Sequence, residues 1–192
     1  MVKNIFRFSA YSTTQEFRGS LIVETYKNWL TKNDRVLDVG CGTGIVSKQL
    51  ADYFKIKIVG CDIKNYLKRD IKFVKMAYKD KLPLPKNSFD TAMLNDVLHH
   101  ADWDDQEILL REALRVSKKV LLFEVQPTLV GKLCDYILGK IYYKNMLIPF
   151  TFRTSSQWET LFKRLPIRRW KTKKVKRPFF YPFSHIAFCL EK

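Results

Sequence analysis

Two acids and a cluster of glycines occupy positions that suit a ligand containing ribose. Gly40, Gly42 and Gly44 follow a short apolar run that contains Asp38. Glycine permits a sharp turn and lets a ligand lie against bare main chain, and a helix that starts behind the turn offers unpaired N–H groups. Asp62 closes the next apolar run, where α/β nucleotide sites hold ribose hydroxyls with a carboxylate. These residues predict a ribose-binding site.

A second polar group follows a later apolar run, at the carboxyl end where open α/β sheets bind ligands. Asn95 and Asp96 come first, and His99 and His100 come next. A histidine there is a candidate general base because its ordinary pKa is near ~6.5, although one of the two histidines could instead bond the loop. Glu124, which ends the following run, either faces the substrate or bonds the neighbouring loop. We predict His100, Asp96 and Glu124 as catalytic residues.

Helical and strand-like segments alternate along the chain, which indicates a parallel sheet with helices between its strands. Glycine spacing of the type G-x-G-x-G differs from the dinucleotide pattern because Ile45 stands where the last glycine would be. The expected helices cover residues 13–31, 44–54, 104–116 and 154–164. The expected strands cover residues 36–39, 56–61, 71–75, 89–94, 119–125, 167–177 and 184–190.

Four motifs in this order resemble the class I S-adenosylmethionine-dependent methyltransferases, in particular their small-molecule type 11 branch. The motifs are Arg35 to Gly44, Leu82 to Asp90, Asn95 to His100, and Glu112 to Val116. The resemblance spans roughly residues 30 to 125. It implies one α/β domain over residues 1–192, a Rossmann-like three-layer sandwich. Its sheet has seven mostly parallel strands, with the last strand antiparallel and inserted beside the fifth.

The resemblance also implies S-adenosyl-L-methionine as the cofactor and a set of residues that hold it. Asp38 should orient the amino group or the turn, Asp62 should accept from both ribose hydroxyls, and Ile63 should lie on the adenine. Relatives often carry an acid where this chain has Tyr78, so either the backbone at Ala77 and Tyr78 or a shifted Asp80 holds the adenine. The expected cofactor residues are Asp38, Gly40, Cys41, Gly42, Gly44, Asp62, Ile63, Ala77, Tyr78, Asn95 and Tyr11.

Composition bounds the class of protein and its partners. The 192 residues are 46% apolar, enough for one domain with a substantial core, and the formal charge of +16 predicts attraction to acidic molecules or surfaces. The four cysteines form no C-x-x-C pair, and no histidine cluster completes a metal site, so we expect no metal and a reducing, cytoplasmic location. No apolar run reaches the length of a membrane span.

Two segments outside the motifs bear on the acceptor. Residues 127–150 contain an amphipathic helix in which Leu129, Leu133 and Ile137 recur every four residues. This insert covers the substrate, packs on the sheet, or lies on an anionic membrane surface. Residues 163–177 carry nine cations and no acid, which suits either a protected edge strand or a phosphate-binding patch.

Three functions follow from these patterns. The first is methyl transfer to a small-molecule acceptor, lipid-like or anionic. The alternative is an RNA methyltransferase that uses the basic 163–177 surface, and a further alternative is a non-catalytic cofactor-binding partner protein. Weak contact with nucleic acid or an anionic membrane surface is compatible with the charge. The sequence does not specify the oligomeric state.

Overall fold

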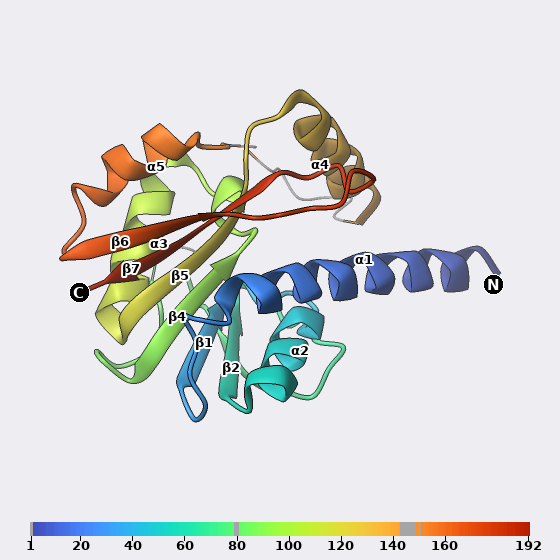
Figure 1. The fold of residues 1–192 in the computed structure, drawn as a ribbon. Helices are drawn as coiled ribbons and strands as arrows, with labels where there is room; N and C mark the ends of the chain where they lie inside the picture. The colour runs from blue at the N-terminus through green and yellow to red at the C-terminus, as the bar shows by residue number, and fades with distance from the viewer. Residues whose placement is uncertain (1, 79–80, 143–148, 150) are drawn as a thin grey trace.

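A central β-sheet carries helices on both of its faces (Figure 1). The computed structural model describes the backbone of residues 2–78, 81–142, 149 and 151–192, and side chains within these ranges except residues 2–13, 135 and 138–142. The strands are β1 (Arg35–Val39), β2 (Lys57–Asp62), β3 (Lys72–Lys75), β4 (Phe89–Asn95), β5 (Ser117–Val125), β6 (Arg169–Lys174) and β7 (His185–Glu191). The helices are α1 (Val2–Tyr26), α2 (Ile45–Phe54), η1 (Leu98–His100), α3 (Trp103–Val116), α4 (Leu129–Tyr142) and α5 (Ser155–Phe162).

The strand order is β3-β2-β1-β4-β5-β7-β6 over the described residues. The pairs from β3 to β5 are parallel, whereas β7 runs antiparallel between β5 and β6. This arrangement confirms the predicted Rossmann-like sheet, including the insertion of the last strand beside the fifth. It brings the carboxyl ends of β1, β2, β4 and β5 to one edge, so the polar residues at those ends lie together.

Two apolar cores fill the layers on either side of the sheet. One core packs α1 and α2 onto the sheet through residues such as Ile22, Tyr26 and Leu50. The other packs α3 and α5 onto the opposite face, with Trp158 and Phe162 among its largest buried side chains. The strands are therefore covered on both faces, as the continuous apolar run in β5 predicts.

Most element boundaries agree with the sequence within a few residues, but the first helix does not. The helix predicted over residues 13–31 covers Val2–Tyr26 instead. It stops early because the N–H groups of Trp29 and Leu30 both donate to the Tyr26 carbonyl and form a tight turn. Asn33 then adopts a left-handed conformation (φ 71°), which directs the chain into β1. The strand expected over 167–177 is also shorter than predicted and covers only Arg169–Lys174.

Candidate active site

The glycine turn between β1 and α2 exposes main chain to open space at one position. Gly40, Gly42 and Gly44 all have positive φ, at 73°, 51° and 71°. A Cβ at Gly40 would meet Val97, and one at Gly44 would meet Leu67 at 2.7 Å, so close packing requires both glycines. A Cβ at Gly42 would meet no atom within 4 Å. Gly42 therefore borders the space in which the predicted ligand lies against the backbone.

The Asp62 carboxylate lies at the end of β2, directly against this turn. Its Oδ2 accepts a hydrogen bond from the Gly42 N–H at 2.9 Å, and its Oδ1 accepts from the Ile63 N–H at 2.7 Å. Burial raises the pKa of Asp62, and backbone donors at Gly42, Ile63 and Lys64 oppose that rise. Each carboxylate oxygen keeps capacity for a further donor, as a ribose diol requires.

Asp38 is the centre of a buried polar chain beneath the turn. Its Oδ2 accepts from the Ser47 hydroxyl at 2.5 Å, and its Oδ1 lies 3.4 Å from the Asn95 amide nitrogen. The Asn95 oxygen in turn accepts from the Tyr26 hydroxyl at 2.8 Å. Burial raises the pKa of Asp38 to about 6, although the Ser47 hydrogen bond opposes the rise. Within this hydrogen-bonded chain, few donors contact the Asp38 carboxylate. A cationic group beside it would therefore stabilise its charged form.

The residues expected around the adenine lie beside Asp62. Ile63, Met76 and Ala77 line an open hollow together with Lys75. The Tyr78 side chain is exposed. Asp80 and the Tyr11 side chain lie outside the described residues, so the two alternatives for the adenine contact both stay predictions.

Cys41 contributes main chain rather than its thiol to this region. Its backbone N–H donates to the Cys61 carbonyl at 3.2 Å. Its sulfur packs above Gly60, where an added Cβ would come within 2.7 Å of it. Burial raises the pKa of the Cys41 thiol, so the thiol stays protonated at neutral pH.

Helix α1 lies across the carboxyl ends of the strands and is held there by polar contacts. The Thr43 hydroxyl donates to Gln15, the Arg18 guanidinium donates to Asp96 at 3.0 Å, and Tyr26 reaches Asn95. None of the sequence-based site predictions includes Gln15, Arg18 or Tyr26. They precede the motifs, and only helical periodicity marks the segment that carries them.

Asp96 is a buried carboxylate paired with two basic groups. It adopts a left-handed conformation (φ 55°), and its side chain lies 3.0 Å from the Arg18 guanidinium and 3.2 Å from His185 Nε2. Burial alone would raise the pKa of Asp96, but His185 and Arg18 together hold it well below its ordinary value. Asp96 is therefore a charged, paired group, suited to positioning rather than to accepting a proton.

Glu124 bonds the loop after β4, which is the second of the two roles considered for it. Its Oε1 accepts from the N–H groups of Val97 and Leu98 at 3.0 and 2.8 Å, and its Oε2 lies 2.8 Å from His99 Nδ1. The Glu124 side chain is 1% exposed. The His99 ring also stacks on Phe152, with 5.0 Å between ring centroids. The catalytic role of Glu124 stays a prediction, and its contacts favour anchoring the loop.

His100 differs from His99 in having a ring nitrogen with no partner. His100 Nδ1 is buried and makes no hydrogen bond within the described residues. Burial and the neighbouring His99 ring lower the pKa of His100 well below 6.5, so the ring is neutral at pH 7. A neutral imidazole with a free nitrogen is able to accept a proton.

Asp96, His99 and Glu124 bring one donor atom each to within 4.8 Å of one another. Three such groups are the minimum for a metal site, but each of them is already engaged. Arg18 is paired with Asp96, and the Glu124 oxygens accept from backbone and from His99. A cation in this cluster would face the Arg18 guanidinium, so the geometry suits a hydrogen-bond network.

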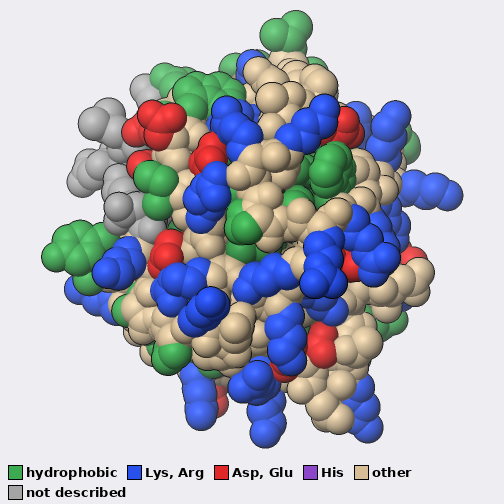
Figure 2. Space-filling view, turned by 90° about the vertical axis from the view of Figure 1, so that its left-hand side faces the viewer, with side chains coloured by type: hydrophobic (Ala, Val, Ile, Leu, Met, Phe, Trp, Pro, Cys, Tyr) green, Lys and Arg blue, Asp and Glu red, His purple; other side chains and the backbone are tan. Residues whose placement is uncertain are grey.

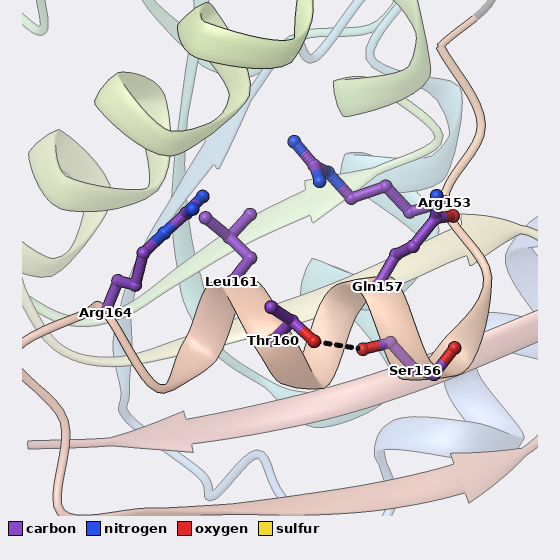
Figure 3. Close-up of a pocket in the computed structure, with 6 residues that line it drawn as sticks. All are labelled: Arg153, Ser156, Gln157, Thr160, Leu161 and Arg164. Carbon is purple, nitrogen blue, oxygen red and sulfur yellow. Dashed lines mark hydrogen bonds between the residues drawn. The ribbon is translucent and has the colours of Figure 1, made fainter.

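A smaller cavity, about 190 Å³ in volume, lies along α5 (Figure 3). The figure shows Arg153 and Arg164 pointing toward the same side of the helix, while the Thr160 hydroxyl donates to the Ser156 carbonyl. The guanidinium groups already have partners, because Arg153 donates to Gln106 and Arg164 pairs with Glu107 at 2.8 Å. None of the predicted site residues lines this cavity.

The basic segment 163–177 runs along the whole outer edge of the sheet. Arg169 pairs with Glu191, which pairs with Lys119 at the amino end of β5. Arg169 and Lys171 both contact the Glu191 carboxylate. Figure 2 shows Lys and Arg side chains gathered on the face that carries α5 and the start of β6, away from the carboxyl ends of the parallel strands. Because Arg169 is level with Lys119 and Lys174 is level with Glu124, the predicted patch extends from the amino end to the carboxyl end of β5.

Comparisons with known proteins bear on these residues. Residues 37–121 match a family model described as a methyltransferase domain. No curated protein matches the sequence significantly. Solved structures match over nearly the whole chain, and their low identities make them similar in fold alone.

One similar structure is a SAM-dependent methyltransferase from Thermotoga maritima, described as a possible histamine N-methyltransferase. It is 20% identical, with a TM-score of 0.71 over 99% of this chain and 97% of that one. A second similar chain comes from the complex between the Haloferax volcanii Trm112 methyltransferase activator and a methyltransferase. It is 15% identical, with a TM-score of 0.72 over 95% of this chain and 93% of that one. Magnesium protoporphyrin IX methyltransferase from Synechocystis PCC 6803, with bound SAH, is 17% identical, with a TM-score of 0.63 over 93% and 84%.

The site fits S-adenosylmethionine by its own geometry. Open space at Gly42 leaves room for the cofactor, and Asp62 offers oxygens to a diol beside it. The family match covers the turn, Asp62 and the loop after β4. No described helix is long and apolar enough to cross a membrane. Residues 37–121 thus match a methyltransferase domain, and the chain has the fold of the class I S-adenosylmethionine-dependent methyltransferases.

Proposed function

We propose that this chain is an S-adenosylmethionine-dependent methyltransferase that acts on a small-molecule acceptor. The observation that carries the proposal is the position of α1, which is fastened over the carboxyl ends of the strands through Gln15, Arg18 and Tyr26. An acceptor must therefore reach the cofactor past α1 and the neighbouring loop, rather than across an open face. Such enclosure suits a small molecule, because ligand sites bury most of a small ligand's surface.

Two cations of the basic segment are paired and lie away from the carboxyl ends of the strands, which favours a small acceptor over a folded RNA. Arg169 and Lys171 are paired with Glu191; Arg169 lies level with Lys119 near the amino end of β5, and Lys171 lies level with Leu121 in its middle. Each residue of a strand advances about 3.3 Å, so Arg169 lies on the order of 20 Å and Lys171 roughly 13 Å from the carboxyl end of β5, whereas Lys174 lies level with Glu124 at that end. An RNA-modifying enzyme would need its phosphate contacts arranged around the acceptor base.

The chain's own residues hold the two reactants. The main chain at Gly40 and Gly42 would support the cofactor, Asp62 would accept from its ribose hydroxyls, and Asp38 would balance the charge of its amino group. When bound, S-adenosylmethionine supplies a methyl group on a positively charged sulfur for in-line transfer. Catalysis by the protein then consists mainly of alignment and exclusion of water.

His100 takes a proton from the acceptor where the acceptor carries one. Its Nδ1 is unpaired and the ring is neutral at pH 7, so a nitrogen lone pair is free to receive the proton, although the lowered pKa makes the ring a weak base. Asp96, fixed by Arg18 and His185, positions this loop rather than exchanging protons. His100→Ala should lower turnover and leave cofactor affinity unchanged, because His100 lies outside the expected cofactor residues.

Transfer of radiolabelled methyl groups tests the acceptor class directly. The full chain is incubated with methyl-labelled S-adenosylmethionine and either a low-mass metabolite extract or total folded RNA. We expect label in the low-mass fraction, lost in Asp62→Asn and retained in Asp52→Asn, a matched change at an exposed acid of α2.

Label that purifies with RNA would instead favour the RNA-methyltransferase alternative. RNA binding that disappears as salt rises would indicate only non-specific phosphate contact, since phosphate-driven affinity falls steeply with salt. Cofactor binding without transfer to either fraction would favour a non-catalytic partner protein and contradict the proposal.

A further inference from the structure

Over the side chains described up to Ile137, helix α4 presents its large apolar groups to solvent rather than to the sheet. Leu129, Leu133 and Ile137 share one face of the helix and are 88%, 61% and 47% exposed. Gly131 lies on the inner side, where it is buried and an added Cβ would come within 3.6 Å of Val125. Over these described side chains the apolar stripe faces away from the sheet, which does not favour the packing alternative for the insert.

A second exposed apolar group lies in the loop between β6 and β7. Phe179 and Phe180 are 96% and 66% exposed. The turn that carries them is well held, because the Tyr181 N–H donates to the Pro178 carbonyl at 3.1 Å and the Arg177 guanidinium donates to the Tyr181 carbonyl. The loop is thus a fixed turn with two phenylalanine rings at its tip.

The two groups leave the sheet at the same place. The Gln126 N–H donates to the Ser184 carbonyl at 2.7 Å, and their side chains are 3.2 Å apart. Helix α4 begins three residues after Gln126, and the phenylalanines lie a few residues before Ser184. Figure 1 shows α4 and this loop at the same end of the molecule. We call Leu129, Val130, Leu133, Tyr136, Ile137, Phe179 and Phe180 the apolar surface.

Charge distinguishes the occupants that such a surface could take. Within residues 126–137 and 172–184 the sequence has five cations and one acid, Asp135. Lys132, Lys174 and Lys176 are exposed. Protein interfaces are depleted in lysine, whereas aromatic and aliphatic groups bordered by lysine and arginine are typical of segments that lie in an anionic lipid interface.

We propose that the apolar surface docks onto an anionic lipid bilayer. Helix α4 lies in the plane of the interface with its outer face among the acyl chains, and the Phe179–Phe180 tip inserts beside it. The surrounding lysines contact lipid phosphates and carboxylates. Because the Phe17 ring of α1 lies 5.9 Å from the Phe180 ring, docking also holds this part of α1 near the membrane, whatever the acceptor is.

Vesicle sedimentation with the full chain tests the proposal without reference to methyl transfer. The probes are vesicles of phosphatidylcholine alone and of phosphatidylcholine mixed with phosphatidylserine. We expect at least ~10-fold stronger partitioning to the anionic vesicles, because cationic contacts add to apolar insertion. Phe179→Ser combined with Phe180→Ser, and Leu133→Gln combined with Ile137→Gln, should each weaken it ~10-fold.

The matched control is Tyr53→Ser, which removes an aromatic ring that is 54% exposed on α2, away from the apolar surface. It should leave partitioning unchanged. The phenylalanine pair is so exposed that its replacement should spare the fold, and thermal unfolding checks this. Equal partitioning of the phenylalanine variant and the parent would overturn the proposal. The proposal would also be overturned if the parent sedimented as a homodimer that these variants dissociate, because the apolar surface would then bind a second copy of the chain.

Discussion

Replacing Asp38 with asparagine should change how the stability of the protein depends on pH. Asp38 is 3% exposed and is held by Ser47 and Asn95, with a pKa raised from 3.8 to about 6. In the unfolded chain the carboxyl has its ordinary pKa. Between these two values the folded protein binds more protons than the unfolded chain, so stability falls as pH rises.

The size of the effect follows from the two pKa values. Their difference, at about 1.4 kcal/mol per pH unit, amounts to about 3 kcal/mol. This contribution is fully present below about pH 4 and is lost once the pH exceeds about 6. Asparagine has nearly the same shape and does not ionise. The variant should therefore gain about 3 kcal/mol relative to the parent between pH 4 and 7.

Urea unfolding of both proteins at several pH values measures this difference, because all other titrating groups cancel in the comparison. Asp90→Asn is a control of opposite sign. The Asp90 carboxylate accepts from Lys118 and Arg35, which lower its pKa. When the parent is compared with Asp90→Asn, the parent should gain stability relative to the variant as pH rises.

A second readout links the same carboxyl to the cofactor. A cationic amino group beside Asp38 favours the charged carboxylate, so affinity for S-adenosylmethionine should rise from pH 5.5 to 7.5 in the parent and stay level in Asp38→Asn. A stability difference that does not change with pH would refute the raised pKa. An affinity for S-adenosylmethionine that does not change with pH in the parent would refute the contact between Asp38 and the amino group.

Three further predictions concern single side chains. Asp62→Asn should weaken S-adenosylmethionine binding in calorimetry by about 10- to 100-fold, since a charged acceptor is worth ~1.5–3 kcal/mol; an unchanged dissociation constant would contradict its role. Gly42→Ala should cost about 1–2 kcal/mol in urea unfolding, because φ is positive, and should abolish cofactor binding, because its Cβ enters the open space; intact binding would show that the cofactor lies elsewhere. Glu124→Gln should lower stability by ~1–3 kcal/mol in urea unfolding, whereas Glu159→Gln on α5 should not; lost turnover at full stability would instead support a catalytic Glu124.

The strands and the glycine turn were predictable because their causes are local. Apolar runs such as Val120 to Phe123 identify buried strands, and glycines at Gly40 to Gly44 identify a turn with positive φ. The acids at strand ends then follow from the geometry of a parallel sheet. The position of Asp62 beside Gly42 is therefore largely a consequence of sequence order.

The hydrogen-bond and ion-pair partners of the buried acids could not be predicted from local sequence patterns. Arg18 meets Asp96 and Glu124 meets His99 across long stretches of chain, and nothing in the local pattern specifies these pairs. For α4, periodicity indicates one apolar face, but its outward direction depends on Gly131 packing inward against Val125. Such outcomes depend on which surfaces compete for burial in the complete fold.

The insertion of β7 between β5 and β6 has a consequence for synthesis in the cell. Glu124 in β5 pairs with Ile186 in β7, so the ribosome must add about 60 residues before this edge of β5 finds its neighbour. At roughly 5–20 residues per second the delay is on the order of 3–12 seconds. During this interval an unpaired, apolar strand edge is open to other nascent chains. The yield of folded protein therefore depends on translation speed and chaperone supply, separately from the stability of the finished sheet.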